Sequence, residues 1–151
     1  MTKPRNIPCQ ACGHNPDKKI SYQHEETIRF KWKSGNLINP PGHNSRWVYR
    51  EYRKKFGAAF ATVGHNFTRS DNFRRITLTR VYGKGPKGGS CYPFDDDNLA
   101  QGAKPIIDYL VTEGLLRDDS PSDIERVYKQ EASEDGKHYM KIRIEEFDES
   151  K

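Results

Sequence analysis

The chain has 151 residues and a formal net charge of +5 at pH 7, and 31% of its residues are charged. A chain of this length is most simply one domain, which buries about two thirds of its unfolded surface. Every apolar run is far shorter than the roughly 20 residues of a membrane helix, and residues 1–5 lead into no apolar signal segment. We therefore expect a cytoplasmic protein, whose basic excess permits binding to nucleic acid or another polyanion.

Residues 1–19 are expected to form an N-terminal extension to a folded domain of residues 20–151. Cys9 and Cys12 are two residues apart, the spacing found in half of a structural zinc site, which needs four ligands. Three cysteines in total fit a reducing compartment better than a disulfide framework. Two interpretations stay open: a Zn²⁺ ion held weakly by Cys9 and Cys12, and a flexible terminus with reduced thiols.

The first half of the folded domain predicts a strand, a helix and a second strand. Residues 27–33 alternate strictly, which places three apolar side chains on one face of a strand: Ile28, Phe30 and Trp32. Residues 45–64 carry apolar side chains at helical spacing: Val48, Tyr52, Phe56, Ala59, Phe60 and Val63. Residues 74–82 predict a second strand with two apolar residues on one face: Ile76 and Leu78.

The second half predicts a helix and a β-hairpin. The helix follows three consecutive aspartates and ends near Gly114. The hairpin joins a strand at about residues 124–131 to a strand with three inward apolar residues, Met140, Ile142 and Ile144, through a turn at Asp135 and Gly136. The order of elements predicts the α+β class: a single small domain with a mixed sheet of about four strands, covered by two helices and closed by the C-terminal hairpin.

The three aspartates, residues 95–97, concentrate negative charge in a basic chain. In an extended segment Asp95 and Asp97 project to the same side, and two converging carboxylates suit Mg²⁺ or Mn²⁺. A second acidic pair, Asp118 and Asp119, follows the helix, where the chain could return to the same end of the sheet. The alternative is that Asp97 or the next residue caps the helix and the other aspartates are solvated.

Other ligand-binding motifs do not fit these residues. A calcium-binding EF-hand loop that starts at Asp95 requires Gly and Glu where Ala100 and Ile106 stand. A glycosyltransferase Asp-x-Asp site belongs in a nucleotide-binding α/β domain, which the length and strand order do not supply. The glycine-rich residues 83–90 lack the spacing of a phosphate-binding P-loop. Metal-assisted chemistry on phosphate in a basic protein remains as the local interpretation.

The region from residue 94 to residue 121 resembles the RusA-like Holliday junction resolvases, including the versions carried by bacteriophages. The similarity is an ordered constellation: Asp95-x-Asp97-Asn98-Leu99, Lys104, Asp108-Tyr109-Leu110, Gly114 and Asp118-Asp119-Ser120. The whole pattern is more specific than Asp-x-Asp alone. Residues 1–20 match nothing in the core of that family.

The resemblance implies a homodimeric, Mg²⁺-dependent endonuclease that acts in DNA recombination and repair, in the cytoplasm of a bacterium or of a phage-infected host cell. Such an enzyme nicks opposing strands of a four-way DNA junction, with one cut per subunit. Carried over onto this chain, the metal ligands are Asp95, Asp97 and Asp119, with Mn²⁺ as a substitute for Mg²⁺, and the assisting lysine is Lys104. The role of Asp118 stays open.

Lys104 departs from the family pattern in its spacing. The lysine follows the second aspartate by four residues in the best-known members, whereas Lys104 follows Asp97 by seven and Gln101 occupies the shorter spacing. If the segment is one helix, Lys104 faces the same way as Asp97 about 10 Å further along the axis. If Pro105 is instead the first residue of the main helix, a separate turn precedes it. A solvated surface lysine is the ordinary alternative.

A group of basic residues is expected to hold the DNA arms through phosphate contacts, which position the DNA without reading its sequence. Its members lie on the first helix, the second strand and the glycine-rich loop: Arg46, Arg50, Arg53, Lys54, Arg74, Arg75, Lys84 and Lys87. Two further functions stay open at this point. One is a non-catalytic basic DNA-binding protein with a degenerate acidic site, and the other is a metal-dependent nuclease that cuts flaps or forks.

Overall fold

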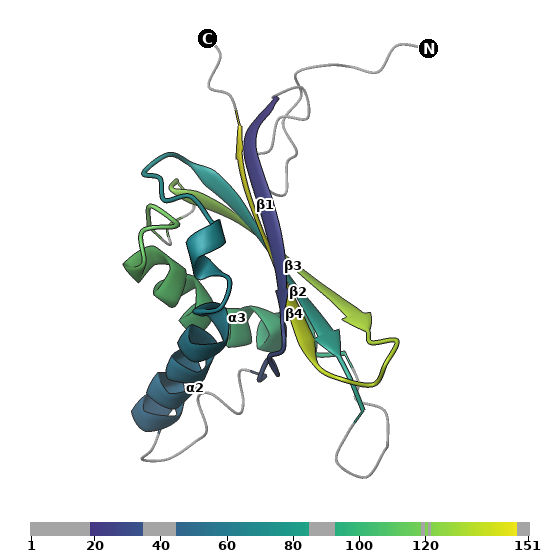
Figure 1. Cartoon of the computed structure of the whole chain (residues 1–151). Helices are drawn as coiled ribbons and strands as arrows, with labels where there is room; N and C mark the ends of the chain where they lie inside the picture. Colours follow the sequence, from purple (N-terminus) through teal and green to yellow (C-terminus); the bar gives the residue numbers. More distant parts are fainter. Residues whose placement is uncertain (1–18, 35–44, 85–92, 119, 121, 148–151) are drawn as a thin grey trace.

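The computed structural model describes residues 19–34, 45–84, 93–118, 120 and 122–147 (Figure 1). Four strands form one sheet in the order β1-β4-β2-β3, and helices α2 and α3 lie against one face of it (Figure 1). The elements are β1 (Ile20–Ile28), α2 (Ser45–Phe60), the 3₁₀ helix η1 (Gly64–Asn66), β2 (Arg74–Tyr82), α3 (Asp96–Thr112), β3 (Ile124–Ala132) and β4 (Tyr139–Phe147). The α+β class, the mixed sheet and the two covering helices are confirmed.

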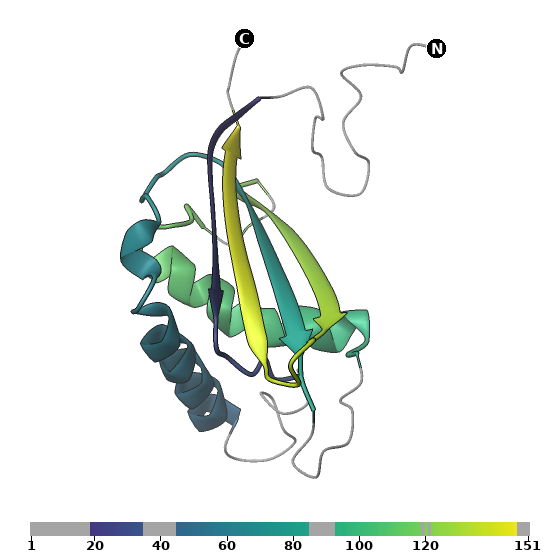
Figure 2. The same ribbon diagram turned by 45° about the vertical axis from the view of Figure 1, so that its right-hand side comes forward.

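A parallel pair of strands determines where α3 begins and ends. β2 pairs in parallel with β3, whereas β4 is antiparallel to both of its neighbours, β1 and β2. Parallel strands need a long crossover connection, and α3 lies in the one between β2 and β3. The first residues of α3 therefore follow the carboxyl end of β2, and the last ones lead back to the amino end of β3. Figure 2 shows α3 crossing behind the sheet, from the carboxyl end of β3 toward the side of β1.

The two C-terminal strands are consecutive and antiparallel, as expected of a hairpin, but they do not pair with each other. β2 lies between them and forms hydrogen-bonded ladders with both. Their connection passes over the end of β2, where the Ser133 N–H donates to the Tyr82 carbonyl and the Lys84 N–H to the Gly136 carbonyl, each at 2.9 Å. Gly136 has φ +77°, a conformation that glycine adopts without strain. β2 lies between β3 and β4 because the connection through α3 places β3 on the far side of β2. The periodicity of single segments does not reveal this connection.

The first strand begins and ends earlier than the alternating pattern predicts. β1 covers Ile20–Ile28 rather than residues 27–33, although the predicted apolar face, Ile28, Phe30 and Trp32, is buried. The early part of β1 is an edge strand whose residues are mostly polar, so its sequence carries little strand signal. The apolar alternation therefore predicted the buried residues correctly, but it predicted the wrong bounds for the hydrogen-bonded strand.

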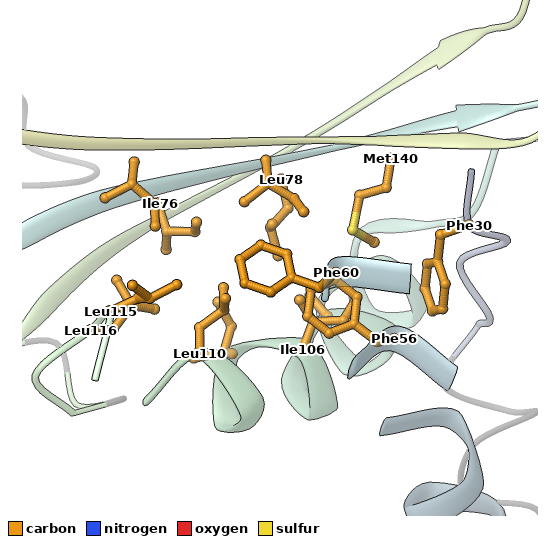
Figure 3. Packing of buried hydrophobic residues seen from close by; sticks show 14 of the residues in the cluster. Phe30, Phe56, Phe60, Ile76, Leu78, Ile106, Leu110, Leu115, Leu116 and Met140 are labelled. Atoms are coloured by element: carbon orange, nitrogen blue, oxygen red, sulfur yellow. The ribbon is translucent and has the colours of Figure 1, made fainter. Parts of the chain in front are cut away.

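The core fills the space between the two helices and the sheet (Figure 3). Its residues come from both helices and all four strands. The most buried of those labelled are Phe56, Ile76, Leu78, Ile106, Leu110 and Met140, each 0% exposed. α2 ends at Phe60, four residues before the predicted end at residue 64. Among the described residues, no helix is both long and apolar enough to cross a bilayer.

Gly102 allows α3 to lie directly on the segment that follows β1. A Cβ atom at this position would lie 2.0 Å from the Lys33 carbonyl oxygen and 2.4 Å from Nε1 of the buried Trp32. Both distances are far below van der Waals contact, and one of the obstructing atoms belongs to the backbone. The close approach of α3 to residues 32 and 33 therefore requires a glycine at this position. Gly102 lies in the first half of α3, the helix that begins with the aspartates.

Gly102→Ala is expected to lower the free energy of unfolding by about 1–3 kcal/mol, the usual cost of overpacking. The reason is steric, because the same exchange in an open helix would favour folding by about 1 kcal/mol through helix propensity. Urea denaturation followed by circular dichroism measures the change. Gln101→Ala, at the exposed neighbouring position, is the control and should stay within about 0.5 kcal/mol. A Gly102→Ala protein more stable than the parent would contradict the packing described for α3.

Candidate metal and nucleic-acid site

The three aspartates occupy the exposed N-terminus of α3. Asp95 is the N-cap: its Oδ1 accepts from the Asn98 N–H at 2.8 Å and its Oδ2 from the Asn98 side-chain amide at 3.1 Å. Asp96 and Asp97 lie in the first turn, where the positive end of the helix dipole favours carboxylates. The cap is therefore Asp95, rather than Asp97 or Asn98.

The geometry of Asp95 and Asp97 differs from the one predicted. Only Asp95 has extended backbone, with ψ 165°, whereas Asp97 is already helical, so the two are not alternate residues of one strand. Both carboxylates nevertheless stand exposed at one helix end. Mg²⁺ in proteins commonly takes one or two carboxylates and completes its shell with waters and substrate phosphate oxygens. The donor chemistry of this pair fits such an ion. Within the described part of the chain, no group of three or more His, Cys, Asp or Glu side chains could hold a metal.

The acidic turn lies over the carboxyl ends of the two parallel strands. The backbone of Phe94, directly before Asp95, is hydrogen-bonded through both its N–H and its carbonyl to the side chain of Gln130 near the end of β3. In open α/β sheets, ligands bind in the crevice outside the carboxyl ends of the parallel strands. Asp95 and Asp97 lie at the corresponding end of the β2–α3–β3 crossover in this mixed sheet.

The second acidic pair lies at the other end of the parallel strands. Asp118 belongs to the segment after α3, and the next described residue, Ser120, has its carbonyl bound by the Ile124 N–H at the start of β3. Six residues of strand separate Ile124 from Gln130, which corresponds to about 20 Å. The chain therefore does not return to the end of the sheet where Asp95 lies, and this expectation was wrong. Asp119 itself is outside the described residues, as are Cys9 and Cys12.

Lys104 lies on an uninterrupted helix, because α3 runs from Asp96 to Thr112 with Pro105 inside it. This is the longer of the two geometries considered, with Lys104 about 10 Å beyond Asp97 along the axis. Its side chain is 55% exposed, and its Nζ lies 3.5 Å from Oδ1 of Asp108. Together with Arg126 and Tyr128 of β3, it lines a groove of about 420 Å³ between α3 and the edge of the sheet.

The basic residues of α2 lie beside the middle and the C-terminal half of α3. Arg46, Arg50 and Lys54 are exposed, whereas Arg53 donates from Nη2 to Oγ1 of Thr112 at 2.8 Å. Tyr49 adds a hydrogen bond from its hydroxyl to the Asp108 carboxylate. Asp108 is thirteen residues beyond Asp95, or about 20 Å along the axis. The structure therefore places the basic helix and the acidic turn at different ends of α3.

Near the carboxyl end of β2, Lys84 is exposed, and Lys87 is outside the described residues. Arg75 lies on the face of the sheet away from the helices, and its side chain is 19% exposed. Its Nε is 2.8 Å from Oε1 of Glu145, and its Nη1 is 3.8 Å from Oε2 of the buried Glu125. Lys84 is therefore exposed at the end of the sheet where the acidic turn lies, while Arg75 lies on the opposite face of the sheet from the helices.

Arg74 was predicted to contact DNA, and the structure corrects this. The side chain is 1% exposed, and its Nε donates to Oε1 of Glu146 at 2.9 Å. Its Nη1 donates to the carbonyls of Thr68, at 2.6 Å, and Leu115, at 3.1 Å. Alternation along β2 turns Arg74 to the helix side together with the core residues. The guanidinium therefore ties the segments around α3 to the sheet and does not reach the surface.

We expect Arg74→Met to lower the free energy of unfolding by about 3–5 kcal/mol, because it leaves Glu146 without its buried partner. Burial alone would raise the pKa of Glu146, but hydrogen bonds from Arg74, Asn72 and Ser70 outweigh it and hold the pKa below its usual value. The pair therefore stabilises the fold above the ordinary carboxyl pKa and loses its contribution as the pH falls through the lower folded value. Denaturation at pH 7 and pH 3 should show a smaller loss at pH 3.

The exposed Arg50→Met variant is the matched control for Arg74→Met. It removes the same type of side chain from the surface of α2 and should change the stability by no more than about 0.5 kcal/mol. An Arg74→Met protein as stable as Arg50→Met would show that the buried ion pair does not support the fold.

Sequence reasoning missed Arg80 and Gln130, which contact Phe94 directly before Asp95. Their proximity follows from the parallel register of β2 and β3, which a single sequence does not reveal. The chain matches no model of a known protein family, and no curated protein matches it significantly. The resemblance of residues 94–121 to the RusA-like resolvases therefore stays a hypothesis.

Proposed function

We propose that the chain is a Mg²⁺-dependent endodeoxyribonuclease of the RusA-like type, which resolves four-way DNA junctions by paired nicks. The observation that carries the proposal is the exposed pair Asp95 and Asp97 at the carboxyl ends of β2 and β3. Exposed carboxylates at this position in a chain of net charge +5 suit a cation that is shared with a phosphate. The proposed setting is the bacterial or phage-infected cytoplasm, in recombination and repair.

In this proposal Asp95 and Asp97 hold the ion, with Mn²⁺ as a substitute. When bound, the ion supplies an activated water and charge stabilisation at the scissile phosphate. Asp95 presents its oxygens from a cap that the Asn98 bonds hold in place, and Asp97 presents its own from the first turn. Lys104, further along the same helix face, offers its ammonium to a backbone phosphate in the groove beside β3.

The third proposed ligand, Asp119, is assigned to a second protomer. Its neighbours Asp118 and Ser120 lie at the amino end of β3, about 20 Å from the acidic turn at the carboxyl end. Carboxylates around one ion stand within a few ångströms of each other, far less than the distance from these neighbours to the acidic turn. We therefore propose a homodimer in which Asp119 of one protomer completes the site of Asp95 and Asp97 of the other.

Phosphate contacts are assigned to the exposed cations of α2 and of the end of β2: Arg46, Arg50, Lys54 and Lys84. Arg50→Ala should weaken binding to four-way junctions about equally whatever their DNA sequence. It should also reduce the magnitude of the slope of log K against log[salt] by about one. Fluorescence anisotropy between low and moderate salt measures this slope. Lys129→Ala, an exposed lysine of β3, is the control. An unchanged slope for Arg50→Ala would remove α2 from the DNA-binding surface.

One observation favours a second candidate, a non-catalytic basic DNA-binding protein. Both oxygens of Asp95 already accept hydrogen bonds from Asn98, which is the arrangement of a purely structural cap. Binding of junctions without any cut under Mg²⁺ or Mn²⁺ would favour this candidate. Cuts in flaps or forks but not in four-way junctions would keep the chemistry and change the substrate.

A further inference from the structure

A side-chain clamp holds the residue that immediately precedes the acidic turn. The Gln130 amide accepts from the Phe94 N–H through Oε1 and donates to the Phe94 carbonyl through Nε2, each at 2.8 Å. One side chain thus binds both backbone polar groups of one residue, as a neighbouring strand would. The chain at Phe94 is fixed in position and in orientation, one residue before the N-cap Asp95.

Arg80 fixes the clamp itself. It stands directly opposite Gln130 in the parallel ladder, and its Nη1 donates to Oε1 of Gln130 at 2.9 Å. Its guanidinium lies 3.5 Å from the centroid of the Phe94 ring and 4.9 Å from that of Tyr82. Arg80 is 5% exposed, so this stacked and hydrogen-bonded arrangement is shielded from water. Gln130 therefore has one preferred position, which the sheet sets.

We propose that Gln130 and Arg80 are positioning residues for the candidate metal site, which hold the Asp95 cap and the first turn of α3 against the ends of β2 and β3. The inference rests on the proposed function for its metal-binding consequence, but its structural content is independent of catalysis. Both residues reach the acidic turn through Phe94. They act through the backbone of Phe94, where a small rotation would move the Asp95 carboxylate by more than the ~0.5 Å that a metal site tolerates.

The chemistry of Gln130 predicts a graded series of variants. A glutamine amide has both a donor and an acceptor, a glutamate keeps only acceptors when ionised, and a methionine of similar length keeps neither. Gln130→Glu should therefore retain the bond from the Phe94 N–H and the partner of Arg80, whereas Gln130→Met loses the clamp. Arg80→Lys keeps the charge but loses the planar group that stacks on Phe94.

The first readout is amide hydrogen exchange on the full chain without metal. The Asn98 N–H donates to the Asp95 side chain and the Leu99 N–H to the Asp95 carbonyl at 2.9 Å, so both amides report on the turn. In Gln130→Met they should exchange roughly tenfold faster, with Gln130→Glu and Arg80→Lys in between. Gln23→Met is the matched control. Gln23 lies on β1, the opposite edge strand, and the substitution removes the hydrogen bond that its side chain accepts from Arg143.

The second readout is calorimetric titration of the same proteins with Mg²⁺ and the Mg²⁺ dependence of junction cleavage. Loss of an outer partner of a metal site weakens metal affinity by about 10–100-fold, so Gln130→Met should need at least tenfold more Mg²⁺ for the half-maximal rate. The maximal rate at saturating Mg²⁺ should approach that of the parent. Recovery at high Mg²⁺ separates a displaced site from a damaged fold.

Unchanged exchange at Asn98 and Leu99 in Gln130→Met would overturn the inference, as would faster exchange spread evenly over the sheet with an unchanged Mg²⁺ requirement. If the parent chain neither binds Mg²⁺ nor cuts DNA, the proposed function fails and the second readout is lost. The exchange measurement still decides then whether the clamp holds the turn, so the two failures are distinguishable.

Discussion

Asp97→Asn is expected to reduce cleavage of a four-way junction by at least about a hundredfold, since loss of a mere outer partner of a metal site already costs 10–100-fold. The amide keeps the size of the side chain and removes the charge that attracts a cation. Binding of the junction should be unchanged or tighter, because one negative charge next to the phosphates disappears. A labelled synthetic junction, followed by denaturing gel for cuts and by mobility shift for binding, measures both effects.

Asp96→Asn is the control, since it makes the same charge change one residue earlier in the same helical turn. Its cleavage rate should stay within a few fold of the parent. Two variants that behave alike would show that the general charge of the turn matters and that Asp97 is no ligand. Full activity of Asp97→Asn would remove this residue from the site.

The proposed site shared between two protomers predicts complementation. Asp97→Asn and Asp119→Asn homodimers should both be inactive, but a mixed dimer of the two variants contains one site with both aspartates intact. Co-expression with two different affinity tags and tandem purification isolates the mixed dimer. We expect it to nick junctions in one strand, at about the rate of one site of the parent and therefore far above either homodimer.

A mixed dimer of Asp97→Asn with the parent chain is the control, because it also retains one complete site and sets the activity to be reached. An inactive complementing dimer beside an active control would show that each site takes its aspartates from one chain. Light scattering that finds only monomers at micromolar concentration would contradict the shared site outright.

The sequence predicted the fold to different degrees in different segments. β2 has the predicted bounds, residues 74–82, because its apolar alternation is strong on the face that packs under the helices. β1 was misplaced because an edge strand that is polar along most of its length has no such signal. The insertion of β2 between β3 and β4 depends on the crossover through α3, a tertiary feature that local periodicity does not contain.

The sequence allowed candidate site residues to be named, but it did not allow their distances and contacts to be predicted. The acidic cluster at the start of the helix follows from composition, and the shared helix face of Asp97 and Lys104 follows from their spacing of seven residues. The distance between Asp95 and Asp118 was misjudged, although a helix of 17 residues is about 25 Å long and separates its two ends by that amount. Gln130 and Arg80 had no signal, because a polar residue in a strand gives no sign of which backbone its side chain will bind.

The most direct test of the proposed function compares cleavage of a labelled four-way junction with that of a linear duplex of the same sequence, with Mg²⁺ and with EDTA, using Asp97→Asn as control. We expect symmetric nicks in the junction only, which require Mg²⁺ and are absent in the variant. Binding of the junction with no cut under Mg²⁺ or Mn²⁺ would contradict it and leave a DNA-binding protein whose aspartates only cap a helix.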